Sequence, residues 1–84
     1  MVMCYPNPFR STATIKILRS KWNNLDKKVT IYDSGMKEVR VLPWMKNQPV
    51  LTFQKGNLSC GVFYLLVESS DNTVIGGCKI VVMD

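Results

Sequence analysis

The chain has 84 residues and a mass of 9.6 kDa, which is enough for one small domain and too little for two. Hydrophobic residues make up 46% and charged residues 20% of the sequence, which excludes a disordered tail, and no apolar run approaches the ~20 residues of a membrane-spanning helix. Lysine and arginine outnumber aspartate and glutamate by five, and the absence of histidine, the commonest general base and metal ligand, argues against catalysis.

The first distinctive segment is Tyr5-Pro6-Asn7-Pro8-Phe9, in which two prolines fix φ at alternate positions. Each proline also disfavours the helical conformation of the residue before it, so we expect a stiff, extended segment. We interpret it as a rigid entry to the first strand, with Tyr5 and Phe9 packing at the edge of the domain. A polyproline II ligand is the weaker interpretation, because no second P-x-x-P repeat follows.

Two stretches then alternate between apolar and polar residues with a period of two, the pattern of strands that have one solvated face. Residues 12–17 place alanine and isoleucine on one face, and Asn23-Asn24 ends the pattern. Residues 29–32 repeat it, and the turn signal Asp33-Ser34-Gly35 leads into a further strand over residues 38–42. The sequence therefore predicts a hairpin over residues 29–42.

The next segment contains two prolines, Pro43 and Pro49, which bracket a polar connection over residues 44–48. Residues 50–53 predict a short strand at a sheet edge, and Lys55-Gly56-Asn57 predicts a turn. Residues 62–67 are apolar on both faces, which indicates a central strand covered on both sides.

The C-terminal part predicts a hairpin. Residues 69–72 supply the turn and residues 74–83 the last strand, with Cys78, Ile80 and Val82 pointing inward and Lys79 outward. Gly76-Gly77 suggests a bulge in that strand. Six or seven short strands without a helix predict an all-β fold, a single small antiparallel β-sandwich of immunoglobulin-like type over residues 1–84. A small barrel of the OB type is the structural alternative.

The three cysteines, Cys4, Cys60 and Cys78, form no C-x-x-C pair, so a structural zinc site is not expected. Their odd number permits at most one internal disulfide, and the three possible pairings and the fully reduced state all stay open. Of these, we favour small thiols buried in the core.

The positive charge is concentrated in the first two thirds of the chain, because residues 1–55 carry ten basic and three acidic residues. Arg19, Lys21, Lys27 and Lys28 form the densest group. We interpret such a group as solvated loops and strand edges rather than as a nucleic-acid site.

Five motifs in order resemble a known family: Y-P-N-P-F at Tyr5, T-A-T-I-K-I at Thr12, V-T-I-Y-D-S-G-M-K-E-V at Val29, N-L-S-C-G-V-F-Y at Asn57 and K-I-V-V at Lys79. The family is the type A C-terminal sorting domain of cargo proteins exported by the type IX secretion system of the Bacteroidota. Its members carry P-N-P-F, T-x-I-x-I, I-Y-D-x-x-G-x-x-V, N-L-x-x-G-x-Y and a closing K-x-V-V. The resemblance extends from Tyr5 to Val82, in spacing as well as residue type.

The chain departs from the family pattern in a few places. Gly35 stands one position before the usual glycine, where this chain has Met36, so we expect a different turn geometry. Phe63 replaces the tyrosine that often follows Gly-Val, and Met83-Asp84 replaces the basic ending. Cysteines at positions 60 and 78 are not family features.

The resemblance implies that the chain is the last domain of a longer secreted protein and acts as an address label. Its cargo would cross the inner membrane, fold in the periplasm and pass the outer membrane through a translocon that recognises the domain. A surface sortase would then cleave just upstream of Tyr5 and attach the cargo to anionic lipopolysaccharide. The implied partners are therefore the type IX translocon, the sortase and the covalently attached cargo, without a cofactor, nucleic acid or direct membrane insertion. The implied location is the medium or the cell surface.

A signal that is read as a folded object needs a presented surface rather than reactive groups. The candidate recognition residues are Pro6, Asn7, Pro8, Gly35, Gly61, Val62, Tyr64 and Lys79. For the apolar members a pure folding role is an equal interpretation, and an exposed edge strand offers β-augmentation as a further mode of recognition.

Two binding functions remain as alternatives. A carbohydrate-binding or adhesive module would use Trp22 or Trp44 as an exposed stacking platform. An OB-like binder of single-stranded nucleic acid would stack bases on these tryptophans, Tyr32 and Phe53. An enzyme is the weakest interpretation, because the acidic residues fall mostly in predicted turns and no histidine is present to activate Cys60.

Overall fold

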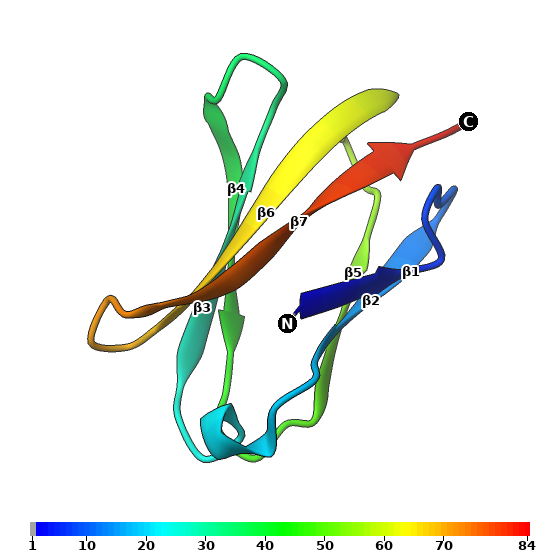
Figure 1. Ribbon diagram of the computed structural model, residues 1–84. Coiled ribbons are helices and arrows are strands. Elements are labelled where there is room, and N and C mark those ends of the chain that lie inside the picture. The colour runs from blue at the N-terminus through cyan, green and yellow to red at the C-terminus, as the bar shows by residue number, and fades with distance from the viewer. Residues whose placement is uncertain (1) are drawn as a thin grey trace.

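The structure, a computed structural model, describes residues 2–84. Seven strands and one 3-10 turn follow each other along the chain (Figure 1). They are β1 (Val2–Tyr5), β2 (Thr12–Ile17), the 3-10 turn η1 (Ser20–Trp22), β3 (Lys27–Tyr32), β4 (Glu38–Trp44), β5 (Val50–Gln54), β6 (Gly61–Ser69) and β7 (Val74–Val82). No α-helix occurs in this range, so none there is long and apolar enough to cross a membrane.

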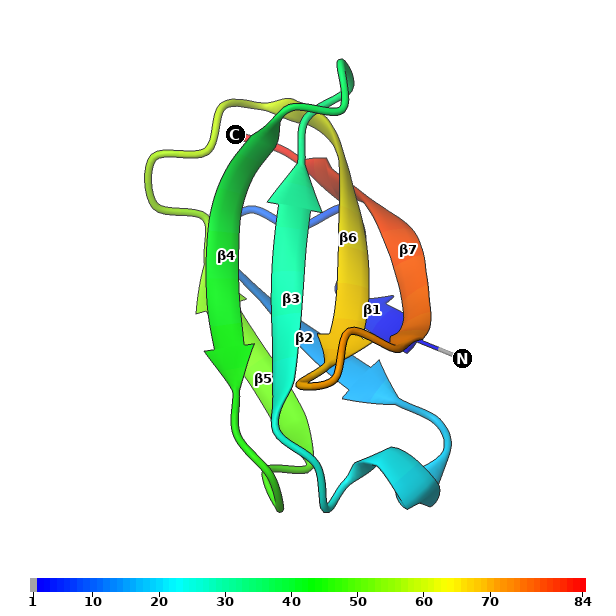
Figure 2. The same ribbon diagram turned by 90° about the vertical axis from the view of Figure 1, so that its left-hand side faces the viewer.

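The strands form two antiparallel sheets that face each other. One sheet has the order β1-β2-β5, and the other has the order β4-β3-β6-β7. Figure 2 looks onto the four-stranded sheet, with the three-stranded sheet behind it. This arrangement confirms the predicted immunoglobulin-like β-sandwich, with seven strands.

The core lies between the sheets and takes its side chains from the inward faces of both. Period-two alternation explains most of it, since β2 contributes Ala13, Ile15 and Ile17, and β6 contributes Phe63, Leu65 and Val67. The other buried apolar residues are Phe9, Val29, Ile31, Trp44, Leu51, Phe53, Leu58, Ile80 and Val82.

The structure confirms the predicted strand 12–17, the hairpin β3–β4 and the last hairpin β6–β7. The strand β5 lies at the edge of its sheet, as expected. The last strand does contain a bulge, but the register shifts at Ile75, between Val74 and Gly76, one residue before the predicted glycine pair. The strand β1 was not predicted.

The prediction for β6 is half right. The strand lies between β3 and β7, but only its inward face is covered. Val62, Tyr64 and Leu66 point to the outer face of the four-stranded sheet, and Tyr64 is 38% exposed. A strand that is hydrogen-bonded to a neighbour on each side, as β6 is, therefore need not have both of its faces covered.

The predicted connection after Pro43 is wrong at its start. Pro43 and Trp44 belong to β4, which tolerates a proline because it is the outermost strand of its sheet. Trp44 is 1% exposed, and its indole nitrogen donates a hydrogen bond to the Gln48 carbonyl at 2.7 Å.

The interpretation of the basic group as solvated is wrong for Lys27, which is 5% exposed. Its ammonium donates to the carbonyls of Trp22 and Leu25, at 3.1 and 2.8 Å, and lies 5.1 Å from the centre of the Trp44 ring. Burial lowers the pKa of Lys27, and the nearby Asp26 opposes this shift. Lys27 therefore binds the η1 segment to the core.

Candidate recognition surface

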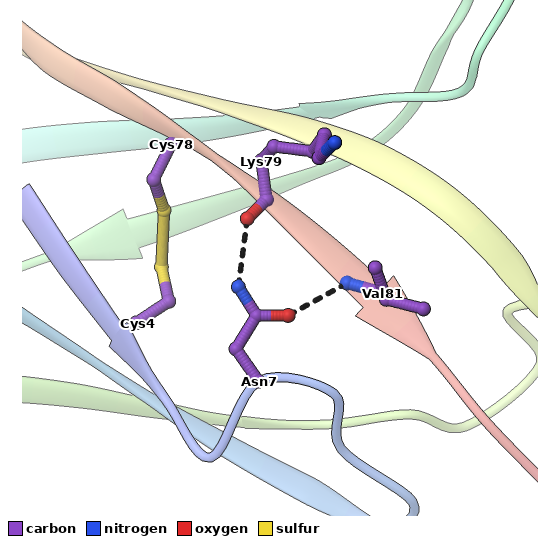
Figure 3. Close-up of a disulfide and its surroundings, with 5 residues drawn as sticks. All are labelled: Cys4, Asn7, Cys78, Lys79 and Val81. Atoms are coloured by element: carbon purple, nitrogen blue, oxygen red, sulfur yellow. Dashed lines mark hydrogen bonds between the residues drawn. A yellow bond between two sulfur atoms is a disulfide. The ribbon is translucent and has the colours of Figure 1, made fainter.

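The P-N-P-F segment lies along the outer edge of β7, as Figure 3 shows. The side-chain amide of Asn7 donates to the Lys79 carbonyl at 2.8 Å, and its oxygen accepts from the Val81 N–H at 3.0 Å. One carboxamide thus presents to β7 the donor and acceptor that a neighbouring strand would supply.

The pairing continues beyond Asn7 through the main chain. The Phe9 N–H donates to the Val81 carbonyl at 3.0 Å, and the Met83 N–H donates to the Phe9 carbonyl at 2.8 Å. Phe9 and Val82 form a parallel bridge. Phe9 therefore lies at the edge of the sandwich with its main chain, as expected, but its ring is buried in the core and meets Phe53 edge-on, with centroids 5.5 Å apart.

The two prolines of the motif, Pro6 and Pro8, are exposed on either side of Asn7. The Tyr5-Pro6 and Asn7-Pro8 peptide bonds are both cis. Because proline has no N–H, neither residue brings an additional donor to the β7 edge.

A disulfide between Cys4 and Cys78 joins β1 to β7 at the same edge (Figure 3). The favoured interpretation of three buried thiols is therefore wrong. Cys60, which is exposed, is the one cysteine of residues 2–84 outside the bond. Cys4 gave no pairing signal in the sequence, because β1 itself was not predicted, and only the two-sheet arrangement brings it beside Cys78.

Three candidate residues from β6 lie next to this edge. Gly61 pairs with Val82, Val62 with Val81, and Tyr64 with Lys79. Gly61, the first residue of β6, has φ = 143°, a conformation that glycine adopts without steric cost. Lys79 is exposed beside the half-exposed Tyr64 ring, so both side chains are presented on the outer face of the sheet.

Gly35 is separate from the other candidates. It lies in the β3–β4 turn, where its N–H donates to the Asp33 carboxylate at 2.9 Å. Gly35 does not have a positive φ, whereas Met36, which occupies the family's glycine position, has φ = 65°. The left-handed conformation is thus adopted at position 36 by a residue that disfavours it.

A group of contacts around Asp84 was missed by sequence reasoning. Lys55 lies 3.7 Å from the Asp84 carboxylate, and Arg10 donates to the Asp84 carbonyl. The carboxylate also accepts a hydrogen bond from the Cys60 thiol, which raises the pKa of Cys60 and lowers that of Asp84. A thiol held in its protonated form is a poor nucleophile, so the exposure of Cys60 does not indicate catalysis.

A pocket of about 290 Å³ opens between the β3–β4 turn and the loop before β6. It is lined by Asp33, Val39, Asn57, Leu58, Ser59 and Phe63. Its one carboxylate, that of Asp33, accepts hydrogen bonds from the N–H groups of Gly35 and Lys37. Within residues 2–84, no three potential metal ligands of the His, Cys, Asp or Glu type come together.

The aromatic residues considered for base or sugar stacking are mostly not available. Trp44 and Phe53 are buried in the core, and Trp22 is half-buried beneath the ammonium of Lys21, 4.9 Å from the ring centre. Trp44 and Phe53 therefore cannot form an exposed stacking platform, and Tyr32 is half-buried as well.

The comparisons with known proteins agree with the motif pattern. No curated protein matches the chain. Residues 3–83 match the family described as the secretion system C-terminal sorting domain, which covers nearly the whole chain. The chain therefore belongs to the secretion system C-terminal sorting domains, the sorting signals of the type IX system.

Proposed function

We propose that residues 1–84 form one sorting domain at the C-terminal end of a longer exported protein, and that a type IX translocon recognises this domain in its folded form. The observation that carries the proposal is the contact between Asn7 of the P-N-P-F motif and the Lys79–Val81 stretch of the closing K-I-V-V motif. Motifs 72 residues apart in the chain form one edge, so a receptor that needs both has to bind a folded surface.

Within this surface, we assign direct contact with the translocon to the outward side chains of Val62, Tyr64 and Lys79. These belong to adjacent strands and are exposed or half-exposed. Asn7 and Gly61 act mainly through the shape of the edge, because the carboxamide of Asn7 is engaged by β7 and Gly61 supplies a positive φ. Pro6 and Pro8 flank the contact, and Gly35 shapes the separate β3–β4 turn.

β-Augmentation by the receptor would use a different edge. The β7 edge is already paired with Asn7 and Phe9, whereas β3 is the one strand of the described residues that pairs with β4. A receptor strand that adds to this sheet would therefore pair with β4.

The later steps follow the family scheme. The cargo crosses the outer membrane, and a sortase then cuts upstream of the domain and attaches the cargo to anionic lipopolysaccharide at the cell surface. Because Val2–Tyr5 forms β1 and Cys4 is bonded to Cys78, release of an intact sandwich requires the cut to fall before β1. The domain acts as a label without a cofactor or catalytic activity of its own.

The test is secretion of a fluorescent reporter that carries a general export signal at its N-terminus and residues 1–84 at its C-terminus. It is expressed in a bacterium with a working type IX translocon and in a strain without one. We expect release or surface display only when the translocon is present. Periplasmic retention of a folded, protease-resistant domain in both strains would refute the proposal.

Matched variants of the reporter separate recognition from folding. The double variant Tyr64→Ala/Lys79→Ala removes the proposed contact residues, and Lys28→Ala/Val41→Ala removes an equal charge and another exposed apolar residue from the same outer face. We expect the first variant to be retained and the second to be exported, with both domains folded. Equal export of both variants would show that Tyr64 and Lys79 are not the residues that contact the translocon.

A further inference from the structure

The end of the sandwich opposite the β3–β4 turn combines exposed apolar side chains with positive charge. Leu18 is 57% exposed and Met45 56%, and Leu25 is also exposed. The loops that carry these three residues, residues 18–26 and 45–49, lie together at the lower end of the molecule in Figures 1 and 2. We call this surface the loop end.

Hydrogen bonds hold the two loops of the loop end together. The Asn47 N–H donates to the Asn23 carbonyl at 2.6 Å, and the Lys46 N–H donates to the Asp26 carboxylate at 2.9 Å. The buried ammonium of Lys27 binds two carbonyls of the first loop. The exposed side chains therefore project from an ordered base, which reduces the entropy cost of binding.

The charge of the loop end is positive. Arg19, Lys21 and Lys46 are exposed among the apolar tips, and Asp26 is the one acidic residue of the two loops. The Trp22 ring lies in the same loop beneath the Lys21 ammonium. Apolar tips, a half-buried tryptophan and surrounding lysines are the combination that favours the interface of a negatively charged membrane.

The other end of the sandwich provides an internal comparison. The dipeptide Met36-Lys37 in the β3–β4 turn repeats the dipeptide Met45-Lys46, and Met36 is 62% exposed. There, however, the acidic residues Asp33 and Glu38 flank the dipeptide. Both ends of the sandwich thus expose a methionine next to a lysine, but the two loops of the loop end carry more basic than acidic residues, whereas the β3–β4 turn does not.

We propose that the loop end is a peripheral docking site for an anionic phospholipid surface, in which Leu18, Leu25 and Met45 enter the headgroup boundary while Arg19, Lys21 and Lys46 bind lipid phosphates. The contact lies at the membrane surface and does not require any part of the chain to cross the bilayer. It uses none of the candidate recognition residues, so it stands independently of the proposed sorting function.

The experiment uses the 84-residue chain with two kinds of vesicle, one of phosphatidylcholine alone and one of equal parts phosphatidylcholine and phosphatidylglycerol. Binding is followed by co-sedimentation and by tryptophan emission. Trp22 should shift to shorter wavelength on binding, while the buried Trp44 gives a constant background. We expect binding to the anionic vesicles only, weakening as salt is added.

Two matched variants test the assignment. Met45→Ser/Lys46→Gln removes one apolar tip and one charge from the loop end, and Met36→Ser/Lys37→Gln makes the same change at the opposite end. The first should weaken binding about tenfold, since one lysine near an anionic surface contributes about fivefold and the apolar tip adds to it. The second should leave binding within about twofold, as expected for a surface site away from the interface.

Several outcomes would overturn the proposal. These are equal effects of the two variants, equal binding to neutral vesicles, or no binding to either vesicle. Single-stranded DNA is the control for simple polyanion attraction. If the chain binds DNA as tightly as the anionic vesicles, and Leu18→Ser/Met45→Ser weakens neither, the apolar tips have no role and the site is not a lipid site.

Discussion

The two edge strands of the four-stranded sheet, β7 and β4, differ in whether other segments of the chain cover their outer sides. At β7, the carboxamide of Asn7, the main chain of Phe9 and the Cys4–Cys78 disulfide cover the strand. At β4, no other strand of residues 2–84 is added, Val39 and Val41 are exposed, and Pro43 has no N–H to donate. One edge is thus closed by distant segments of the chain, whereas the other is left unpaired and protected by local features.

The β4 edge is nevertheless tied to the second sheet. The guanidinium of Arg40 donates to the carbonyls of Gln54 and Lys55, at 2.6 and 2.9 Å, and reaches the Asn57 side chain at 3.3 Å. These contacts bridge the two sheets without covering the backbone of β4. The P-N-P-F and K-I-V-V motifs thus meet at the closed edge, whereas at the open edge the side chain of Arg40 makes the contacts with the second sheet.

Loss of the disulfide should have the largest effect on this comparison. The bond closes a loop with a sequence separation of 74. The loop-entropy model gives about 4 kcal/mol of stabilisation for a loop of that length. We expect Cys4→Ser/Cys78→Ser to lower the free energy of unfolding in urea by about this amount, and a reductant to have the same effect on the natural chain.

Cys60→Ser is the control for the disulfide, because Cys60 lies outside the bond and is exposed. Its effect should stay within about 0.5 kcal/mol. A natural chain whose urea midpoint is unchanged by a reductant would show that the closed edge does not depend on the bond.

Asn7→Ala should open the closed edge locally. It leaves the Val81 N–H and the Lys79 carbonyl without their partner, at a cost of about 2 kcal/mol in unfolding free energy. Hydrogen exchange of the Val81 amide should become faster, while the amides of β4 keep their rates.

Asn57→Ala is the matched substitution at the open edge, where one hydrogen bond of 3.3 Å is lost. We expect less than half the destabilisation of Asn7→Ala. Equal effects at the two positions would contradict the distinction between the edges.

Arg40→Ala should separate the sheets at the open edge. Its two carbonyl contacts are charge-assisted but partly solvated, so we expect a loss of about 1.5 kcal/mol by urea unfolding. Arg40→Lys should recover only part of this loss, because an ammonium lacks the planar fork that reaches two carbonyls at once. Full recovery by lysine would show that charge alone is sufficient.

Met36→Gly should give a small gain at the turn that leads into the open edge. Met36 has φ = 65°, a conformation that glycine adopts without steric cost. The gain from relief of this strain is offset in part by the greater freedom of glycine in the unfolded chain, which leaves about 0.5 kcal/mol. Thermal unfolding measures the difference, and a decrease in stability would show that the methionine side chain contributes contacts of its own.

Much of the fold could be predicted because strand periodicity is a local signal. The alternation in residues 12–17 and the Asp33–Gly35 turn depend on neighbours in the sequence, and both were placed correctly. The error at Trp44 came from treating Pro43 as the end of a strand, a rule that does not hold for an outermost strand. The four residues of β1 were too few to show a pattern.

The candidate site was predicted less completely, because its contacts join distant segments. The motifs drew attention to Asn7 and Lys79, but nothing in a single sequence indicates that the carboxamide of one pairs with the backbone of the other. The Cys4–Cys78 bond could not be predicted for the same reason, because it also joins distant segments of the chain.

The pairing of Asn7 with Lys79 and Val81 has a consequence for biosynthesis. The ribosome synthesises the P-N-P-F segment early in the domain and the β7 edge last. Asn7 can therefore pair with Lys79 only after a further 72 residues have been translated. A product that terminates between Phe9 and Lys79 keeps the first motif but lacks the β7 edge with which the motif pairs. Assembly of the closed edge is thus a check that translation has continued through β7, and an exporter that binds this edge would reject truncated cargo.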